Sequence, residues 1–477
     1  MSENLSNLLP LIIWTLILAL LIPVSRIRIG YTFNPAAIFV LVWLAALWTN
    51  RLPELELYPP STESLNLICL SILGFAIGFL LVVGKFKEHL YSTASFGSYL
   101  IANNRFSKVS LIASVILVLV VAKLALPGIS NVLSDTESAA KVRAAVSEDG
   151  GISILKKAGG IWASKYGVIL LEYMVFPGVY TLFGLNLARC IISGTKSSIL
   201  ILLLACLGMV LLDLLAFSRF QCLFIALTFL VGLFFGGHMW SAGQPRLKAR
   251  QAGAFLWFIK FGILGCIALL MTISLLRMRG NMDMSKLSDD PLYYFSQPFT
   301  LFDMRSDVLV KDNFVYSVGG FCDLFNNFWT MILRHREIFF VRTMDLQTMV
   351  NIAPARQANA HYTWCLPFYQ DFGMSGTFIL PALYGMVTGL SFSAYRKSAD
   401  AGKLVAFIYL FAIGLLAILE WRFTWGEFTA EIMPIVVFAV LRWPGQKRYS
   451  HQWRRPIQLG DQARKMAVKQ ISFKQSI

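Results

Sequence analysis

The chain has 477 residues, of which 57% are hydrophobic and 14% are charged, and its formal net charge is +16. A composition this apolar excludes a soluble domain of this length. The basic segments lack interleaved aromatic residues and any binding motif, which argues against a nucleic-acid partner and favours contact with anionic membrane lipid.

Apolar runs recur along most of the chain. A bilayer core of ~30 Å needs about 20 apolar residues per helix, and about eleven runs approach that length. We therefore predict an all-α polytopic membrane protein with about eleven transmembrane helices. In chain order the runs are 8–24, 35–48, 65–84, 109–127, 161–187, 198–217, 220–237, 254–276, 375–395, 404–421 and 428–441.

The basic residues predict the orientation of the chain. Residues 442–477 form a strongly basic tail, which the positive-inside rule places in the cytoplasm. Alternation back from the tail places the N-terminus on the outer side. No basic residue precedes the first run, so we expect an uncleaved helix there and not a signal peptide.

The runs divide the chain into four parts. Residues 1–276 contain helices 1–8, with an outer loop at about 128–160; residues 277–366 form a large outer loop; residues 367–441 contain helices 9–11; residues 442–477 are the tail. The large loop mixes both charges with aromatic residues, which predicts a folded, partly helical cap. In helix 9, Gly385-x-x-x-Gly389 predicts close packing against another helix.

Five arginines lie on or near the outer side, where basic residues are normally scarce. They are Arg143, Arg219, Arg277, Arg279 and Arg422. A planar, always charged donor at several helix ends suits the binding of phosphate. For Arg219, Arg277, Arg279 and Arg422 the alternative is an anchor at the membrane interface, and Arg219 could instead pair with Asp213. For Arg143 the alternative, which we favour, is the solvated face of an amphipathic segment.

Three outward side chains are candidates for a general base. Asp371 and His361 lie close together directly before helix 9, and Glu427 lies in the last outer turn. We rank them Asp371, His361, Glu427. The structural alternative for Asp371 is to cap or charge-stabilise the start of helix 9.

The seven cysteines show no C-x-x-C or Cys/His ligand spacing, so neither a metal site nor a cofactor is predicted. Cys322 and Cys365 both fall in the large loop. They could form a disulfide in an oxidising compartment, but their sequence positions do not show that they meet.

The end of the large loop resembles a known family. Residues 359–376 contain the pattern N-x-x-Y-T followed by Y-x-D-F-G-x-x-G. It is similar to the end of the periplasmic loop in O-antigen and related oligosaccharide repeat-unit polymerases of the Wzy type. The resemblance extends over most of the chain through its layout: the number of helices, the short link Ser218-Arg219 between helices 6 and 7, the long loop and the basic tail.

The resemblance implies a glycosyltransferase at the periplasmic face of a bacterial inner membrane, with the N-terminus in the periplasm. It would transfer a growing glycan from undecaprenyl diphosphate to a new lipid-linked repeat unit, in the biosynthesis of O-antigen, the lipopolysaccharide chain, or a similar surface polysaccharide. The outward arginines would stabilise the charge that develops on the diphosphate. The expected partners are undecaprenyl-diphosphate-linked glycans, membrane lipid and a chain-length regulator protein.

Three other functions stay open. An O-antigen ligase would share the layout but use lipid A core as its acceptor. A flippase or other transporter would carry charge deep in the bundle, for which Glu172, Asp213, Lys260 and Glu431 are candidates. A scaffold without enzymatic activity would have no reason to place arginines at several helix ends.

Overall fold

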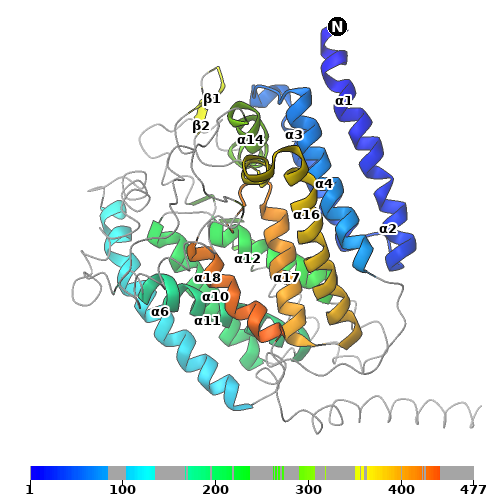
Figure 1. Ribbon diagram of the computed structural model, residues 1–477. Coiled ribbons are helices and arrows are strands. Elements are labelled where there is room, and N and C mark those ends of the chain that lie inside the picture. Colours follow the sequence, from blue (N-terminus) through cyan, green and yellow to red (C-terminus); the bar gives the residue numbers. More distant parts are fainter. Residues whose placement is uncertain are drawn as a thin grey trace, which may run out of the picture.

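The protein is an all-α membrane protein, and a small two-stranded β-hairpin is found among the residues that the structure describes (Figure 1). The computed structural model describes residues 2–83, 104–134, 170–193, 196–216, 220–236, 289–306, 350–354, 356–358, 363–398, 400–421 and 426–440, with a few single residues between them. Within this part, six segments are long and apolar enough to cross a membrane: Leu8–Ile29, Thr62–Val82, Arg105–Val132, Tyr173–Ile191, Ser198–Leu215 and Cys365–Arg396.

The described elements follow the predicted order. In the first part they are α1 (Ser2–Ala19), α2 (Leu21–Ile29), α3 (Pro35–Thr49), the 3-10 helix η1 (Pro53–Leu55), α4 (Thr62–Val82), α6 (Asn104–Leu133), the π-helix η3 (Leu171–Val175), α10 (Phe176–Ser193), α11 (Lys196–Ala216), α12 (Phe220–Val231) and the π-helix η4 (Gly232–Gly236). In the second part they are α14 (Asp289–Arg305), β1 (Val350–Ala353), β2 (Arg356–Ala358), α16 (Cys365–Ser398), α17 (Ala401–Leu416) and α18 (Gly426–Val440).

Most of the predicted apolar runs are helices. The six long spans and four shorter apolar helices coincide with ten of the runs, whereas only scattered residues of the run 254–276 are described. Several boundaries differ from the predicted runs. The first run continues through Arg26 and Arg28 to Ile29, α6 is longer than 109–127 at both ends, α10 continues to Ser193, and α16 begins at Cys365. The count of eleven crossings stays a prediction.

The helix ends are set by ordinary capping chemistry. The Asn34 side chain accepts the N–H of Ala37 at 3.0 Å at the start of α3, and Ser61 does the same for Ser64 at the start of α4. Gly30, with φ of 100°, ends α2 in the left-handed region that favours glycine.

The most extensive helix pair joins α4 to α16, which lie side by side although about 300 residues separate them. At this interface, glycines of each helix lie against the backbone of the other helix. A Cβ at Gly74 or Gly78 would overlap the carbonyl oxygen of Phe378 or Ala382, respectively, and a Cβ at Gly385 would overlap that of Phe75. The predicted close packing of helix 9 is confirmed, because small residues let the two backbones touch.

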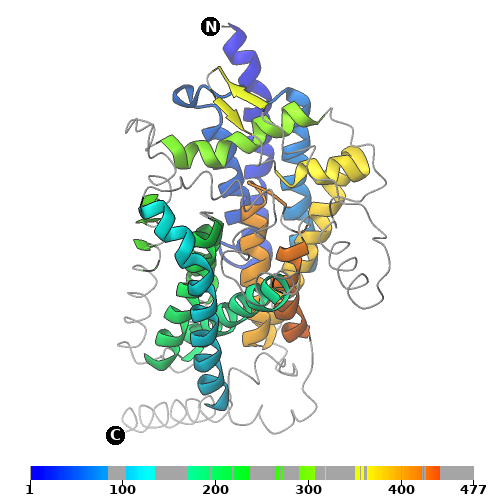
Figure 2. The ribbon, with the colours of Figure 1, turned by 90° about the vertical axis from the view of Figure 1, so that its left-hand side faces the viewer.

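Helix α14 lies across the end of the bundle, and not along it (Figure 2). The α3–α4 loop fastens it there. The Asn50 side chain donates to the carbonyl of Ser296 at 3.0 Å and to the Thr300 hydroxyl at 3.1 Å, and Asp303 accepts the backbone N–H of Ser61 at 3.0 Å. Part of the large loop is therefore helical, as predicted, and α14 is a fixed cap at this end.

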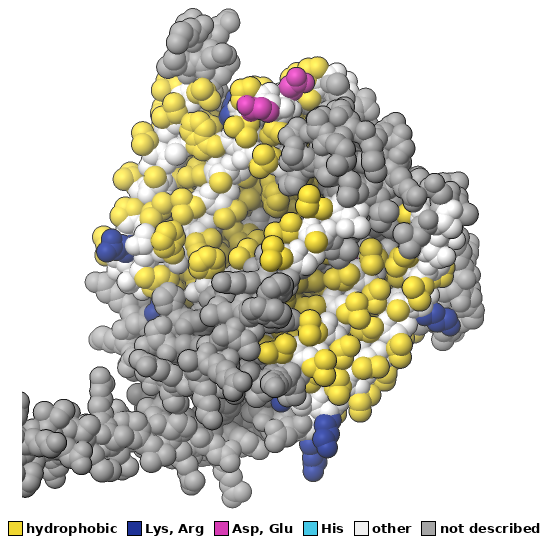
Figure 3. Space-filling model, turned by 180° about the vertical axis from the view of Figure 1, so that it is seen from behind, with side chains coloured by type: hydrophobic (Ala, Val, Ile, Leu, Met, Phe, Trp, Pro, Cys, Tyr) yellow, Lys and Arg dark blue, Asp and Glu magenta, His cyan; other side chains and the backbone are white. Residues whose placement is uncertain are grey.

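Most exposed charged side chains of the described helices lie toward the two ends of the bundle; the exceptions include Lys123, which is exposed within α6. Exposed acids lie near α14, including Glu54, Glu56 and Glu63, and the face in Figure 3 is mostly apolar with its acidic side chains at that edge. At the opposite end the helices carry exposed basic residues: Arg26, Arg28, Arg105 and Lys108. The predicted orientation, in which the basic end faces the cytoplasm, stays a prediction.

The predicted orientation can be tested with one residue from each end. We expect Glu54→Cys to react with a membrane-impermeant thiol reagent in intact cells, because Glu54 is exposed at the α14 end. We expect Lys108→Cys to react only after permeabilisation. The wild-type protein gives the background from native cysteines, and the reverse labelling pattern would invert the topology.

Candidate functional site

The segment that carries the family-like sequence pattern forms the bent start of α16. Gly373 breaks this helix with φ of 59° and ψ of −150°, so the part Cys365–Phe372 and the descending part from Met374 are two limbs. The first limb lies beneath α14 and over the upper end of α17 (Figure 1). Asp371 is half-buried at the end of the first limb, directly before the bend.

Asp371 holds a residue of the large loop. Its Oδ2 accepts the backbone N–H of Ser317 at 2.6 Å, and the Trp421 indole donates to the carbonyl of the same Ser317 at 2.7 Å. Ser317 is buried. This hydrogen bond ties α16 to the loop, and the roles expected for Asp371, a general base or a cap at the start of helix 9, stay predictions.

A cluster of aromatic rings lies behind this contact, with the buried Trp364 at its centre. The Trp364 indole donates to the Ser71 hydroxyl at 3.0 Å, and its backbone N–H donates to the carbonyl of Ala417 at 2.9 Å. Six rings surround it at centroid distances between 5.2 and 6.1 Å: Phe39, Trp43, Phe75, Phe368, Tyr384 and Trp421. The cluster fixes Trp421 and the first limb of α16.

Buried charges accompany this aromatic cluster. Arg305, the last residue of α14, is 2% exposed, and Glu420, next to Trp421, is 8% exposed. Charged residues are almost never buried unless they are paired or functional. Neither residue was predicted as part of a site, because nothing in the sequence distinguishes Arg305 from an ordinary loop arginine. Its buried position adds an arginine to the charged groups at this end.

Nearby, Arg51 lies partly buried in the α3–α4 loop, where its guanidinium donates to the carbonyl of Pro60 at 3.4 Å. Burial lowers the pKa of Arg51, and the charge of Asp303 opposes that shift. The pair links the loop electrostatically to α14.

Most of the predicted site residues cannot be placed. Asp371 is described, and Glu427 lies in the first turn of α18, although its side chain is not described. The others lie outside the described residues: Arg143, Arg219, Arg277, Arg279, His361 and Arg422. The clustering of the five arginines at one site therefore stays a prediction.

Cys365 is a free thiol, buried against the Ser71 hydroxyl at 3.3 Å. Its possible partner in a disulfide, Cys322, lies outside the described residues. In the part of the chain that the structure describes, no group of three or more His, Cys, Asp or Glu residues could hold a metal ion.

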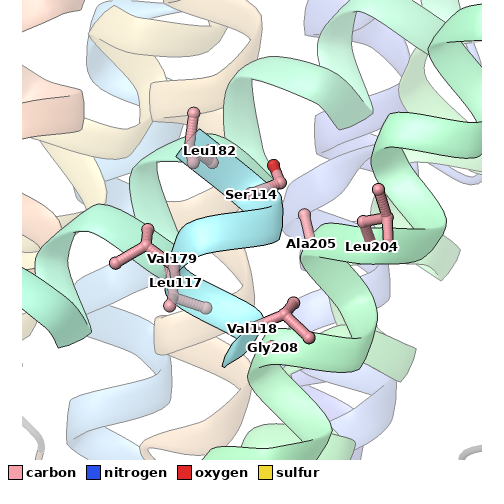
Figure 4. A pocket seen from close by; sticks show the side chains of 8 residues that line it. All are labelled: Ser114, Leu117, Val118, Val179, Leu182, Leu204, Ala205 and Gly208. Carbon is pink, nitrogen blue, oxygen red and sulfur yellow. The ribbon is translucent and has the colours of Figure 1, made fainter. Parts of the chain in front are cut away.

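A small crevice lies elsewhere, between α6, α10 and α11 (Figure 4). It is lined by Ser114, Leu117, Val118, Val179, Leu182, Leu204, Ala205 and Gly208. One hydroxyl among apolar groups offers nothing to hold a charged substrate, so this crevice is not the candidate site. The candidate site is the contact in which Asp371 and Trp421 hold Ser317, with the buried Glu420 next to Trp421.

Comparison of the chain with protein-family models, with curated proteins and with solved structures found no match.

Proposed function

We propose that the protein polymerises oligosaccharide repeat units carried on undecaprenyl diphosphate, at the periplasmic face of a bacterial inner membrane. The observation that carries the proposal is the sequence pattern of residues 359–376, together with the position of its aspartate. Asp371 lies directly before the bend of α16, and its carboxylate holds Ser317 of the large loop; in the proposal, a lipid-borne substrate and a polar acceptor would meet at this bend.

In the proposed reaction the anomeric carbon of the growing glycan is transferred from the diphosphate to a hydroxyl of the incoming repeat unit. Asp371 would take the proton of that hydroxyl, with His361 and Glu427 as the alternatives. The arginines Arg143, Arg219, Arg277, Arg279 and Arg422 would bind the diphosphate and stabilise the charge that develops as its bond to the sugar breaks. Neither a metal nor a cofactor is part of the proposal.

Deletion of the gene tests the proposal through the surface polysaccharide. We expect glycans with a single repeat unit attached to their normal anchor, because ligation would continue without polymerisation. Re-expression of the wild-type gene should restore long chains. A complete loss of attached antigen would contradict a polymerase, and an assay with lipid A core as acceptor would then distinguish a ligase from a flippase.

The transporter alternative has one observation in its favour. Asp213 and Glu431 are buried within the bundle, at 0% and 3% exposure, and intramembrane charge is common on transport pathways. Asp213, however, has a structural role, because it accepts two backbone N–H groups of α12. Accumulation of lipid-linked repeat units on the cytoplasmic side of the deletion strain would favour transport over polymerisation.

A further inference from the structure

Two arginines lie at a corner of the bundle where α2, α4 and α16 end, on the side opposite to α14. Arg28, in the last turn of α2, is exposed, and its Nε donates to the carbonyl of Val83, directly after α4, at 3.0 Å. Arg396 is half-buried near the end of α16. Both arginines lie at the ends of membrane-crossing segments, Leu8–Ile29 and Cys365–Arg396, which is the level of the lipid headgroups.

Aromatic rings connect Arg396 to the same corner. Its Cζ lies 5.5 Å from the ring centroid of Tyr31, three residues after Arg28, and 5.5 Å from that of Phe392. These distances are within the range of a cation–π interaction, which holds a guanidinium in place. The Phe392 ring in turn lies 5.7 Å from the ring of Phe79 in α4. The two arginines therefore approach the end of α4 from two different helices.

The Arg28 guanidinium is fixed and still has donors for a ligand. Arginine carries five N–H donors in a rigid fork, and the Val83 carbonyl accepts the one on Nε. This hydrogen bond satisfies a carbonyl at the negative end of the α4 dipole, and it also orients the fork. Phosphate oxygens accept paired hydrogen bonds from a guanidinium, which require such a fixed direction.

The surroundings of the corner suit a lipid. The exposed side chains beside it are apolar: Val24 and Ile27 in α2 and Leu81 in α4. An acid at this end of the bundle, Asp400, has a backbone partner, because its Oδ1 accepts the N–H of Lys403 at 3.0 Å and caps α17. An anionic headgroup would thus meet guanidinium groups, and its acyl chains would meet apolar side chains.

We propose that this corner binds the phosphate headgroup of an anionic phospholipid between Arg28 and Arg396, with the acyl chains along α2 and α4. The inference does not depend on the proposed function. Roughly 33 Å of helix, at 1.5 Å per residue, separates Arg396 from Met374, just after the bend that follows Asp371.

The first membrane-crossing segment gives such a lipid a role. In the most apolar stretch of this segment 17% of the residues are buried within the protein, compared with 67% for the α4 segment. Lipid tails are as apolar as side chains, so burial alone does little to hold a helix against its neighbours in a membrane. A headgroup bound to α2 and α16 together joins the first segment to the bundle by polar contacts.

The test uses the purified full-length protein in detergent, with native mass spectrometry to count bound lipids and thermal unfolding as a second readout. The probe is dioleoyl-phosphatidylglycerol, and zwitterionic dioleoyl-phosphatidylcholine has the same acyl chains for comparison. We expect the anionic lipid to bind at least about tenfold more tightly and to raise the melting temperature. Equal binding of the two lipids would overturn the inference. Inorganic phosphate should leave the melting temperature unchanged; an equal rise would indicate a site for soluble phosphate and overturn the lipid assignment.

Arg28→Ala and Arg396→Ala should each weaken binding of the anionic lipid about tenfold or more, the scale of a hydrogen bond to a charged group. Lysine at either position should restore only part of the affinity, because it keeps the charge but loses the fork. The lysine variants also serve where an alanine variant does not fold. Wild-type affinity in both lysine variants would overturn the inference, since charge alone would then suffice.

Arg105 provides the matched control. It is an exposed arginine at the same end of the bundle, at the start of α6, which lies on the opposite side of the bundle from α2 (Figure 1). Arg105→Ala removes the same group and the same charge, so we expect it to bind the anionic lipid like wild type. A loss as large as that in Arg28→Ala would show attraction by net charge and not by this corner, and would overturn the inference.

Discussion

Replacing Asp371 with asparagine is expected to reduce polymer formation by about 10² to 10⁴-fold, the usual contribution of a general base. Asparagine keeps the shape of the side chain and still has an oxygen to accept the N–H of Ser317, so the contact with the large loop can persist. It cannot take a proton from an acceptor hydroxyl. The measurement is the chain-length distribution of the surface glycan at equal protein abundance.

The Trp421→Phe variant is the control for this experiment. It removes the indole donor to the carbonyl of Ser317 but leaves the Asp371 carboxylate in place. If Asp371 only anchors the loop, Trp421→Phe should impair polymerisation as much as Asp371→Ala does. Long polymer from Asp371→Asn would transfer the role of base to His361 or Glu427, and reduced protein abundance would make Asp371 a structural residue.

Replacing Gly78 with alanine is expected to prevent accumulation of folded protein. The new methyl group would overlap the carbonyl oxygen of Ala382, which belongs to the backbone of α16 and cannot rotate away. The two helices would have to separate along the most extensive interface of the bundle. Overpacking costs roughly 1–3 kcal/mol, and more where backbone must move. The measurements are membrane abundance and thermal stability in detergent.

Gly265 offers the corresponding control. A Cβ at this helical glycine meets nothing within 4 Å, so Gly265→Ala should leave abundance and stability unchanged. Gly385→Ala, on the opposite side of the interface, should reproduce the effect of Gly78→Ala, because its Cβ would overlap the carbonyl of Phe75. Normal stability of both interface variants would show that α4 and α16 do not pack this closely in the membrane.

The sequence predicted the features that depend on one segment at a time. The length of an apolar run identifies a helix, and Gly385-x-x-x-Gly389 identifies a close-packing face. The partner of that face could not be predicted, because Gly74 and Gly78 lie about 300 residues away and their spacing matches other pairs equally well.

In the candidate site, too, the sequence predicted a residue but not its contact partner. Asp371 was recognised because it lies close to His361, directly before a predicted outer helix. Its contact with Ser317 was not predicted, because the hydrogen bond goes to a backbone N–H, which every residue except proline carries. Asp213 was considered only as an alternative partner for Arg219, which lies outside the described residues; its hydrogen bonds to the backbone N–H groups of Gln221 and Cys222 were not predicted.

The packing of α4 against α16 has a consequence for biogenesis. During synthesis α4 enters the membrane early, whereas α16 follows only after about 280 further residues have been translated, at about 5–20 residues per second. For that interval the glycine face of α4 meets lipid tails instead of the backbone of Phe378 and Ala382. The first helices therefore cannot reach their final packing until the last quarter of the chain arrives, and a chain truncated before α16 would lack the helix that completes them.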